Sequence, residues 1–162
     1  MPIVATDIQF KTSTATGNLG GAIAGDDVSS ALHGLFDVVA GAEALSGDAE
    51  YRCVYVKNNH STLTLYNAVA FISSNTPSGD TAVDIGVGTS AVNGVEQTIA
   101  NENTAPAGVS FSNPSAYIGG LQLGDIPAGQ HRAIWIRRTV SAGAAAYSGD
   151  GMTLAVQGDT AA

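Results

Sequence analysis

The side chains of this chain that favour zinc or nucleophilic chemistry are few and far apart. They are three histidines, His33, His60 and His131, and a single cysteine, Cys53. None of them has a second histidine or cysteine at the short spacing of a local zinc motif, so we expect no zinc site. Cys53 alternates with two tyrosines in a predicted strand, which indicates a buried, unreactive thiol.

Aspartates in turns raise calcium as an alternative metal. Hard oxygen ligands are available at Asp26, Asp27, Asp80, Asp84 and Asp150. The chain contains no D-x-D-x-D-G loop and no nonapeptide repeat. Aspartate is also common in turns because it bonds to the local backbone. Local bonding is therefore the simpler interpretation, and calcium stays the alternative.

No pattern predicts a cofactor or a catalytic centre. Residues 86–91 match the loose G-x-G-x-x-A dinucleotide pattern, but the segment after them is unsuited to the helix that this pattern needs. The chain has no G-x-S-x-G nucleophile motif, and its carboxylates lie almost entirely in predicted turns. We expect no enzyme and no cofactor. A hydrolase acting on cell-surface polymer is a hypothesis that would need converging carboxylates or a nucleophile.

The segment 124–140, GDIPAGQHRAIWIRRTV, holds the only tryptophan and half of the six basic residues. Alternation along a strand places Ile134 and Ile136 on one face and Trp135 with Arg137 on the other. One interpretation is a strand at the surface whose arginines pair with aspartates. Another is a protein interface, because Trp and Arg often carry binding energy between proteins. The candidate interface residues are His131, Trp135 and Arg137, with Leu35 and Phe36 as anchors in the N-terminal part.

Charge and composition restrict the class of partner. Fourteen acidic residues against six basic ones give a formal charge of −8, which argues against nucleic acid and anionic membranes. A single cysteine allows no internal disulfide, so cytosolic synthesis is expected. The start has no basic and apolar signal-peptide pattern, and no stretch is long and apolar enough to span a membrane, which predicts a soluble, unprocessed protein.

Short strands separated by turn clusters predict an all-β fold, an antiparallel β-sandwich or jelly roll. The expected strands are 51–58, 63–73, 81–89, 96–100, 109–111, 118–124, 132–140 and 152–158. The first two are expected to pair as a hairpin. Gly86 and Gly88 fall on one face of their strand and predict close approach by another backbone.

The N-terminal part differs from the rest and is expected to be an arm. Residues 1–48 are poor in aromatics and rich in glycine, so they predict a partly extended arm on a neighbour or on the chain's own body. The apolar residues of 28–39 have helix-like spacing, which indicates one short helix there. Residues 49–162 are expected to form the sandwich body.

Four stretches together resemble a group of tailed-bacteriophage virion structural proteins. They are LFDVVAGAEALSGDAEYRCVYVKN (35–58), TAVDIGVGTSAVNGVEQTIANENTAP (81–106), GDIPAGQHRAIWIRRTVSAGAAAY (124–147) and LAVQGDTAA (154–162). The likeness covers about residues 17–162 and lies in phrase order and turn chemistry. It implies a small β-sandwich component, most like a capsid cement or decoration protein.

The resemblance implies a non-enzymatic chain that binds the major capsid protein and stabilises the shell from the outer surface of the virion, after synthesis in the host cytoplasm. An acidic protein is disfavoured beside packaged DNA, which favours the same external position. A dimer or trimer is expected because symmetric assembly covers exposed strand edges. Tail, neck or baseplate accessory proteins and a glycan- or receptor-binding module are the alternatives. The resemblance carries over no functional residues.

Overall fold

The computed structural model describes residues 1–160, and nearly all of their regular structure is strand. The strands are β1 (Ile8–Ser13), β2 (Gly20–Gly21), β3 (Ile23–Asp27), β4 (Asp48–Asn58), β5 (Leu65–Ser74), β6 (Thr81–Val87), β7 (Glu96–Thr98), β8 (Leu121–Ile126), β9 (His131–Val140) and β10 (Thr153–Thr160). The helices are a single 3-10 turn η1 (Ala5–Asp7) and α1 (Gly41–Ser46). In this part of the chain no helix has the length and hydropathy needed to cross a bilayer.

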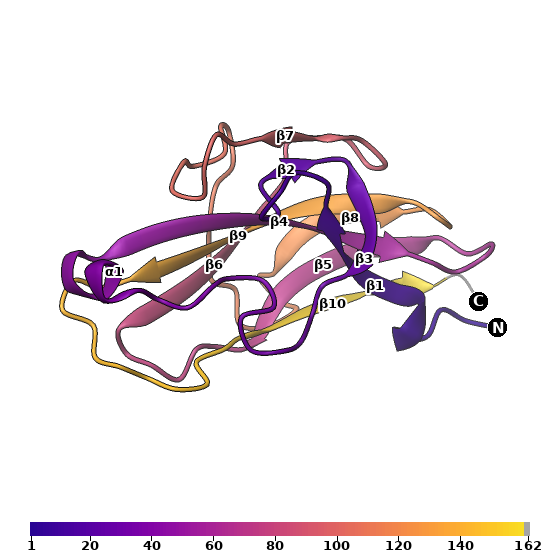
Figure 1. Ribbon diagram of the computed structural model, residues 1–162. Helices are drawn as coiled ribbons and strands as arrows, with labels where there is room; N and C mark the ends of the chain where they lie inside the picture. The colour runs from indigo at the N-terminus through magenta and orange to yellow at the C-terminus, as the bar shows by residue number, and fades with distance from the viewer. Residues whose placement is uncertain (161–162) are drawn as a thin grey trace.

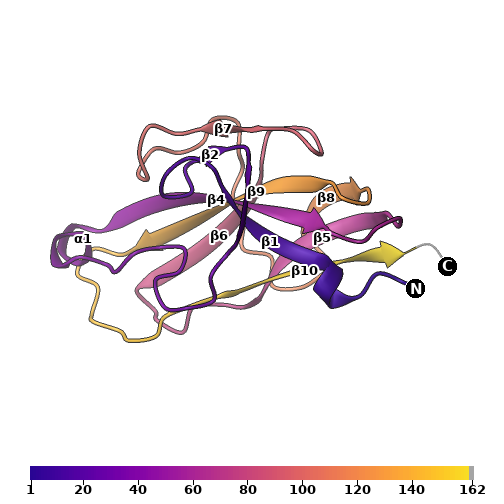
Figure 2. The same cartoon turned by 45° about the vertical axis from the view of Figure 1, so that its right-hand side comes forward.

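Two antiparallel sheets pack face to face, so the all-β sandwich expected from the sequence is confirmed. The larger sheet has five strands in the order β3-β1-β4-β9-β6, and the smaller has three in the order β10-β5-β8. A third, two-stranded ribbon of β2 and β7 lies over the outer face of the larger sheet (Figure 1). The N-terminus and the end of β10 lie at the end of the sandwich opposite to α1 (Figure 2).

The central strands β4 and β9 are apolar on both faces, and this decides where they lie. Val54, Val56, Ile134 and Ile136 face the smaller sheet in the main core. On the opposite face a second cluster gathers around Trp135 beneath the ribbon. The members of that cluster are Tyr51, Cys53, Tyr55, Ile99, Ala133 and Trp135.

The strand that carries Trp135 is therefore not a surface strand. β9 lies between β4 and β6, with chain on both of its faces. Both faces of β9 carry apolar residues because each face is covered, one by the smaller sheet and the other by the ribbon and its flanking loops. The predicted burial of Cys53 is confirmed, and burial raises the pKa of its thiol.

β4 and β5 do not form the predicted hairpin, because they belong to different sheets. The chain between them arches from one sheet to the other around the buried side chain of Asn58. Its Nδ2 donates to the carbonyl oxygens of Leu63 at 2.8 Å and Ile126 at 2.9 Å, and its Oδ1 accepts from the backbone N–H of His60. Each strand has an apolar face that must be buried, and the arch lets these faces pack on each other.

The N-terminal residues are built into the body rather than set apart as an arm. β1 pairs with β4 from Ile8↔Asn58 to Thr12↔Val54, so it is a member of the larger sheet. The boundary drawn between residues 48 and 49 therefore crosses one continuous sheet. No helix forms over 28–39, and α1 follows that segment instead. Leu35 and Phe36 pack on the main core whereas Leu32 is exposed, so these residues do not form one helical stripe.

The predicted close approach of another backbone is confirmed for Gly86 of β6 but not for Gly88, which follows β6 and lies against the side chains of Glu96 and Ala133. A Cβ on Gly86 would lie 2.5 Å from Val109 Cγ1 and 2.7 Å from the carbonyl oxygen of Ser110. The expected strand at 109–111 is reduced to one bridge between Ile85 and Ser112. This segment crosses the outer face of the larger sheet, where only glycine leaves room for it.

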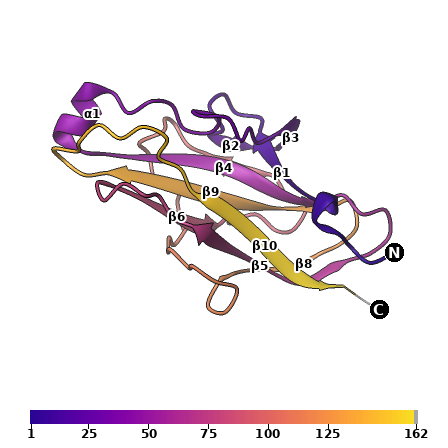
Figure 3. The same cartoon turned by 90° about the horizontal axis from the view of Figure 1, so that it is seen from below.

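The larger sheet extends farther toward α1 than the smaller one (Figure 3). Two irregular segments lie near the uncovered part of its inner face: residues 28–40, which we call the strap, and residues 141–152. Leu35 and Phe36 of the strap and Met152 pack against the main core. The strap thus takes the place of missing strands at this end of the sandwich.

Candidate interaction surface at the strap end

Phe36 of the strap is held between two arginines of the larger sheet. The guanidinium carbons of Arg52 and Arg138 lie 5.2 Å and 4.9 Å from the centre of its ring. Both arginines come from the central strands, and both point to the inner face of the larger sheet. Arg52 of β4 is paired with Ile136 of β9, and Arg138 of β9 is paired with Glu50 of β4. Cations above an aromatic ring are attracted to its π-face, so this arrangement fastens the strap to the sheet.

Three carboxylates surround these arginines. Arg138 Nε donates to Glu50 Oε2 at 2.6 Å, and Arg52 pairs with Glu102. Asp37 of the strap lies 3.4 Å from Arg138 and 3.8 Å from Arg52. Glu50 is buried, with 2% of its side chain exposed. Burial raises the pKa of Glu50 and the nearby Arg138 lowers it, with a net shift upward.

The strap backbone is tied to the sheet at its start by the Val28 N–H, which donates to the carbonyl oxygen of Phe10 in β1, and farther along by the same two arginines. Arg52 Nε donates to the carbonyl oxygen of Leu35 at 3.2 Å, and Arg138 donates to that of Asp37 at 2.7 Å. Within the described chain, the remaining hydrogen bonds of residues 29–39 are local, such as that from the Gly34 N–H to Ala31. The position of the strap therefore depends on Arg52, Arg138 and the Phe36 ring.

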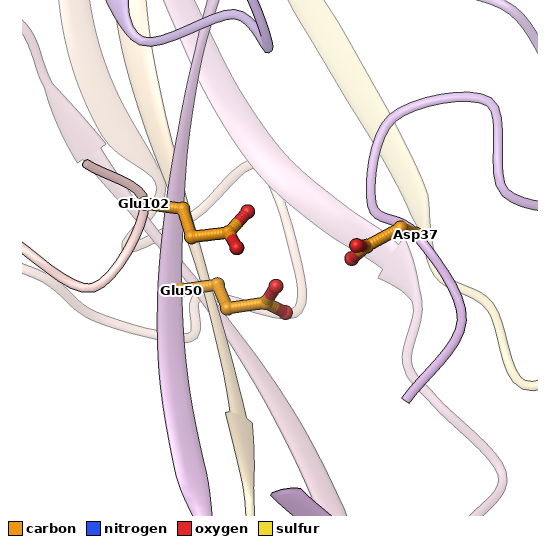
Figure 4. A group of neighbouring side chains, drawn as sticks. All are labelled: Asp37, Glu50 and Glu102. Atoms are coloured by element: carbon orange, nitrogen blue, oxygen red, sulfur yellow. The ribbon is translucent and has the colours of Figure 1, made fainter. Parts of the chain in front are cut away.

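Asp37, Glu50 and Glu102 also form a possible cation site by geometry. Their side chains point toward one another, and ligand oxygens of the three lie within 4.8 Å of each other (Figure 4). However, each of the three already pairs with Arg52 or Arg138, so two guanidinium groups occupy the place that a metal ion would need. We assign this cluster to holding the strap, not to binding a metal.

Large apolar side chains are exposed on the segments at this end. Leu32 is 66% exposed, Val38 63%, Leu45 78% and Tyr147 56%. They lie on the strap, on α1 and on the segment after β9. α1 adjoins that segment, because the N–H groups of Gly143 and Ala144 both donate to the carbonyl oxygen of Ala44. We call Leu32, Val38, Leu45 and Tyr147 the strap-end surface.

The predicted interface residues fall on opposite sides of one sheet. Leu35 and Phe36 lie together under the strap, where they anchor the N-terminal part to the chain's own core. Trp135 is 0% exposed beneath the ribbon, so it has no free area for a neighbour in this structure. Arg137 pairs with Asp84 at 2.7 Å, and that hydrogen bond raises the pKa of Arg137.

His131 shares the ribbon side of the sheet with Trp135 and Arg137. Its ring lies edge-on to Tyr55, with 4.9 Å between ring centres, and its Nε2 is 3.2 Å from the carbonyl oxygen of Gly94. Burial lowers the pKa of His131, so the ring is neutral near neutral pH. These contacts are internal to the chain.

Sequence reasoning named Phe36 as an anchor but missed the charged residues that hold the strap, Arg52, Arg138 and Glu50. The available signal was period two in β4, where Glu50 and Arg52 share a face with the apolar Val54 and Val56. Charged residues in line with a core stripe indicate buried charges that need partners. The identity of those partners had no local signal, because Arg138 and Phe36 are distant in the sequence.

No family model matches the chain, and comparison with curated proteins and with solved structures finds no significant match either. Its function is therefore inferred from the geometry and charge of its own residues.

Proposed function

We propose that this chain is a non-enzymatic virion structural protein that binds the major capsid protein and stabilises the phage shell from outside. The observation that carries the proposal is the strap-end surface: of the nine large apolar side chains that are exposed in the described chain, four lie on the strap, on α1 and on the segment after β9. Apolar side chains gathered on one part of a surface are typical of sites that contact another protein.

The strap that carries part of this surface is fixed to the sheet, which favours long-lived binding. The strap is irregular, yet Arg52 and Arg138 fasten it to the two central strands of the larger sheet. A surface that is already held in place loses less conformational entropy when a partner binds. Repetition on a shell adds avidity to each weak contact, so a small surface on every copy is sufficient. The resemblance of the sequence to tailed-bacteriophage virion structural proteins is the ground for proposing a phage shell as the partner.

The first test measures binding to shells. Shells purified from particles made without this chain are mixed with the purified protein, and the bound copies per shell are counted by quantitative mass spectrometry. We expect on the order of hundreds of copies and a higher melting temperature of the shell, because a cement protein repeats over the lattice. A dozen copies or fewer would favour a neck or tail accessory protein instead. No binding would refute the proposal.

The second test asks whether the strap-end surface makes the contact. We expect Leu45→Ser to weaken binding about tenfold, since it removes the most exposed apolar side chain of the strap-end surface. The matched control is Val95→Ser, because Val95 is also exposed, at 69%, but lies beside the ribbon. If both variants lost the same binding affinity, or if Leu45→Ser lost none, the shell would have to contact another part of this protein.

A further inference from the structure

We propose that the strap-end surface docks on a protein surface whose apolar centre is flanked by lysine or arginine, which makes attachment to the shell salt-dependent. This inference rests on the proposed function and adds the chemistry of the partner. Its basis is an asymmetry in how the chain places its charges.

The basic residues are turned inward. None of the six is exposed, although five of the aspartates are. Lys11 pairs with Asp27, and Arg137 pairs with Asp84. Arg132 donates to backbone carbonyl oxygens in the loop after β6. The remaining two arginines lie under the strap, and Lys57 is half-buried at the end of β4. The basic side chains therefore make their contacts within the chain, and most of the charge that solvent can reach is negative.

Acidic residues are close in the sequence to the exposed apolar residues of the strap end. Asp37 precedes Val38 and has 63% of its side chain exposed. Glu43 lies in α1 with Leu45, and its carboxylate accepts from the Ala40 N–H at 2.6 Å. Each of these carboxylates is close to the strap-end surface along the chain.

Two further acids extend the negative rim. Asp48 begins β4 directly after α1, and Asp80 accepts from the N–H of Ala145, two residues before Tyr147. Beneath the strap, three carboxylates face two guanidinium groups, which leaves one negative charge uncompensated. Of the rim acids, Asp37 faces these arginines, whereas Glu43, Asp48 and Asp80 form no ion pair within the described chain.

An apolar centre with a negative rim selects its partner by charge. A partner with lysine or arginine around an apolar centre gains both hydrophobic contact and Coulomb attraction. An acidic partner, including the strap end of a second copy, would bring like charges together and be repelled. Self-association through this end is thus disfavoured, and the surface is free to meet the shell.

The test compares two triple variants with equal charge. One is Glu43→Gln, Asp48→Asn and Asp80→Asn at the strap end; the other is Asp26→Asn, Asp125→Asn and Asp159→Asn, away from α1. Each set changes the formal charge from −8 to −5, because three acids are removed. The amides keep an oxygen that can accept the hydrogen bonds made by the strap-end carboxylates. Binding to chain-free shells is measured from about 50 mM to about 500 mM salt, where screening becomes strong.

We expect the dissociation constant of the unaltered chain to rise about tenfold over that salt range. The strap-end triple variant should bind about tenfold more weakly at low salt and lose most of the salt response, whereas the distal triple variant should stay within about twofold. Salt-independent binding, equal loss in the two triple variants, or tighter binding by the strap-end variant would overturn this inference and leave the proposed function standing. Absence of binding by the unaltered chain at every salt concentration would refute both.

Discussion

Glu50 and Arg138 form an ion pair in which the Glu50 side chain is 2% exposed and that of Arg138 13%. Arg138→Met would leave a buried carboxylate with Arg52 at 3.7 Å as its nearest cation. Glu50→Gln would leave Arg138 still bonded to the Asp37 carbonyl oxygen. Burial already raises the pKa of Glu50, so its charged form is not strongly favoured by the fold.

We therefore expect Arg138→Met to lower the free energy of unfolding by about 3–5 kcal/mol and Glu50→Gln by less than about 2 kcal/mol. Urea denaturation near neutral pH measures both losses. Equal losses would show that the pair stabilises through mutual attraction and not through the relief of a buried charge.

Glu96, on the other face of the larger sheet, makes the free energy of unfolding depend on pH in the acidic range. Its carboxylate accepts from the Ser90 N–H at 2.9 Å and from the Thr89 hydroxyl at 3.0 Å. Burial raises the pKa of Glu96, but these hydrogen bonds outweigh burial and lower it to about 2. Because the folded pKa is depressed, this stabilisation is present above the unfolded pKa and is lost as the pH falls toward 2.

We expect Glu96 to contribute about 3 kcal/mol near neutral pH that disappears by about pH 2. The measurement is the free energy of unfolding of the chain and of Glu96→Gln at several pH values, whose difference should shrink as the pH falls. Glu50 acts in the opposite sense, since its raised pKa makes the fold less favourable as the pH rises above 4.5, but it is common to both proteins and cancels. A difference that does not vary with pH would contradict the assignment.

At the scale of elements, β6 depends on having no side chain at Gly86. A methyl group there would overlap Val109 and the Ser110 backbone, so the segment 109–112 would have to move. We expect Gly86→Ala to cost about 1–3 kcal/mol. A Cβ on Gly25 of β3 would meet no neighbouring atom within 4 Å, so Gly25→Ala is the matched control and should change stability by less than about 0.5 kcal/mol. Thermal denaturation of both variants checks this.

The strap is expected to open more readily than the strands beneath it. Its residues 29–39 make no backbone–backbone hydrogen bond to either sheet within the described chain, whereas β4 is paired on both sides over much of its length. Hydrogen exchange measured by mass spectrometry should therefore show fast exchange in 29–39 and slow exchange in β4 and β9. Phe36→Ala should leave exchange in β9 slow, because it loosens only the strap. Protection of the strap equal to that of β9 would contradict this description.

At the scale of the whole molecule, residues 1–48 and 49–160 share one sheet, so we expect them to fold as one unit. β1 covers the edge of β4 from Val54 to Asn58, and the strap covers the inner face of the larger sheet near α1. A fragment of residues 49–162 would expose that strand edge and part of the main core. We expect this fragment to aggregate or to lack a cooperative unfolding transition, as measured by circular dichroism and size-exclusion chromatography. A soluble, cooperatively folded fragment would show that the N-terminal part is dispensable for folding.

The strands and the charge of this protein could be predicted from the sequence because both depend on local properties. Period two and turn residues located β5, β6 and β9 to within a few residues, and Gly86 of β6 predicted the close approach of another backbone. The hairpin predicted between β4 and β5 failed because the prediction used local pattern alone. Local pattern shows which face of a strand is apolar, but not whether that face meets a strand beside it or a sheet above it.

The sequence by itself determined an acidic, all-β chain with its turns in place, because strand alternation, turn chemistry and net charge need only neighbouring residues. The tertiary structure alone decided that Trp135 is buried, that β1 completes the larger sheet, and that Phe36 lies between Arg52 and Arg138. These features require residues far apart in the chain to meet across a sheet. Their energies come from burial and from charge pairing at a distance, which no short stretch of sequence contains.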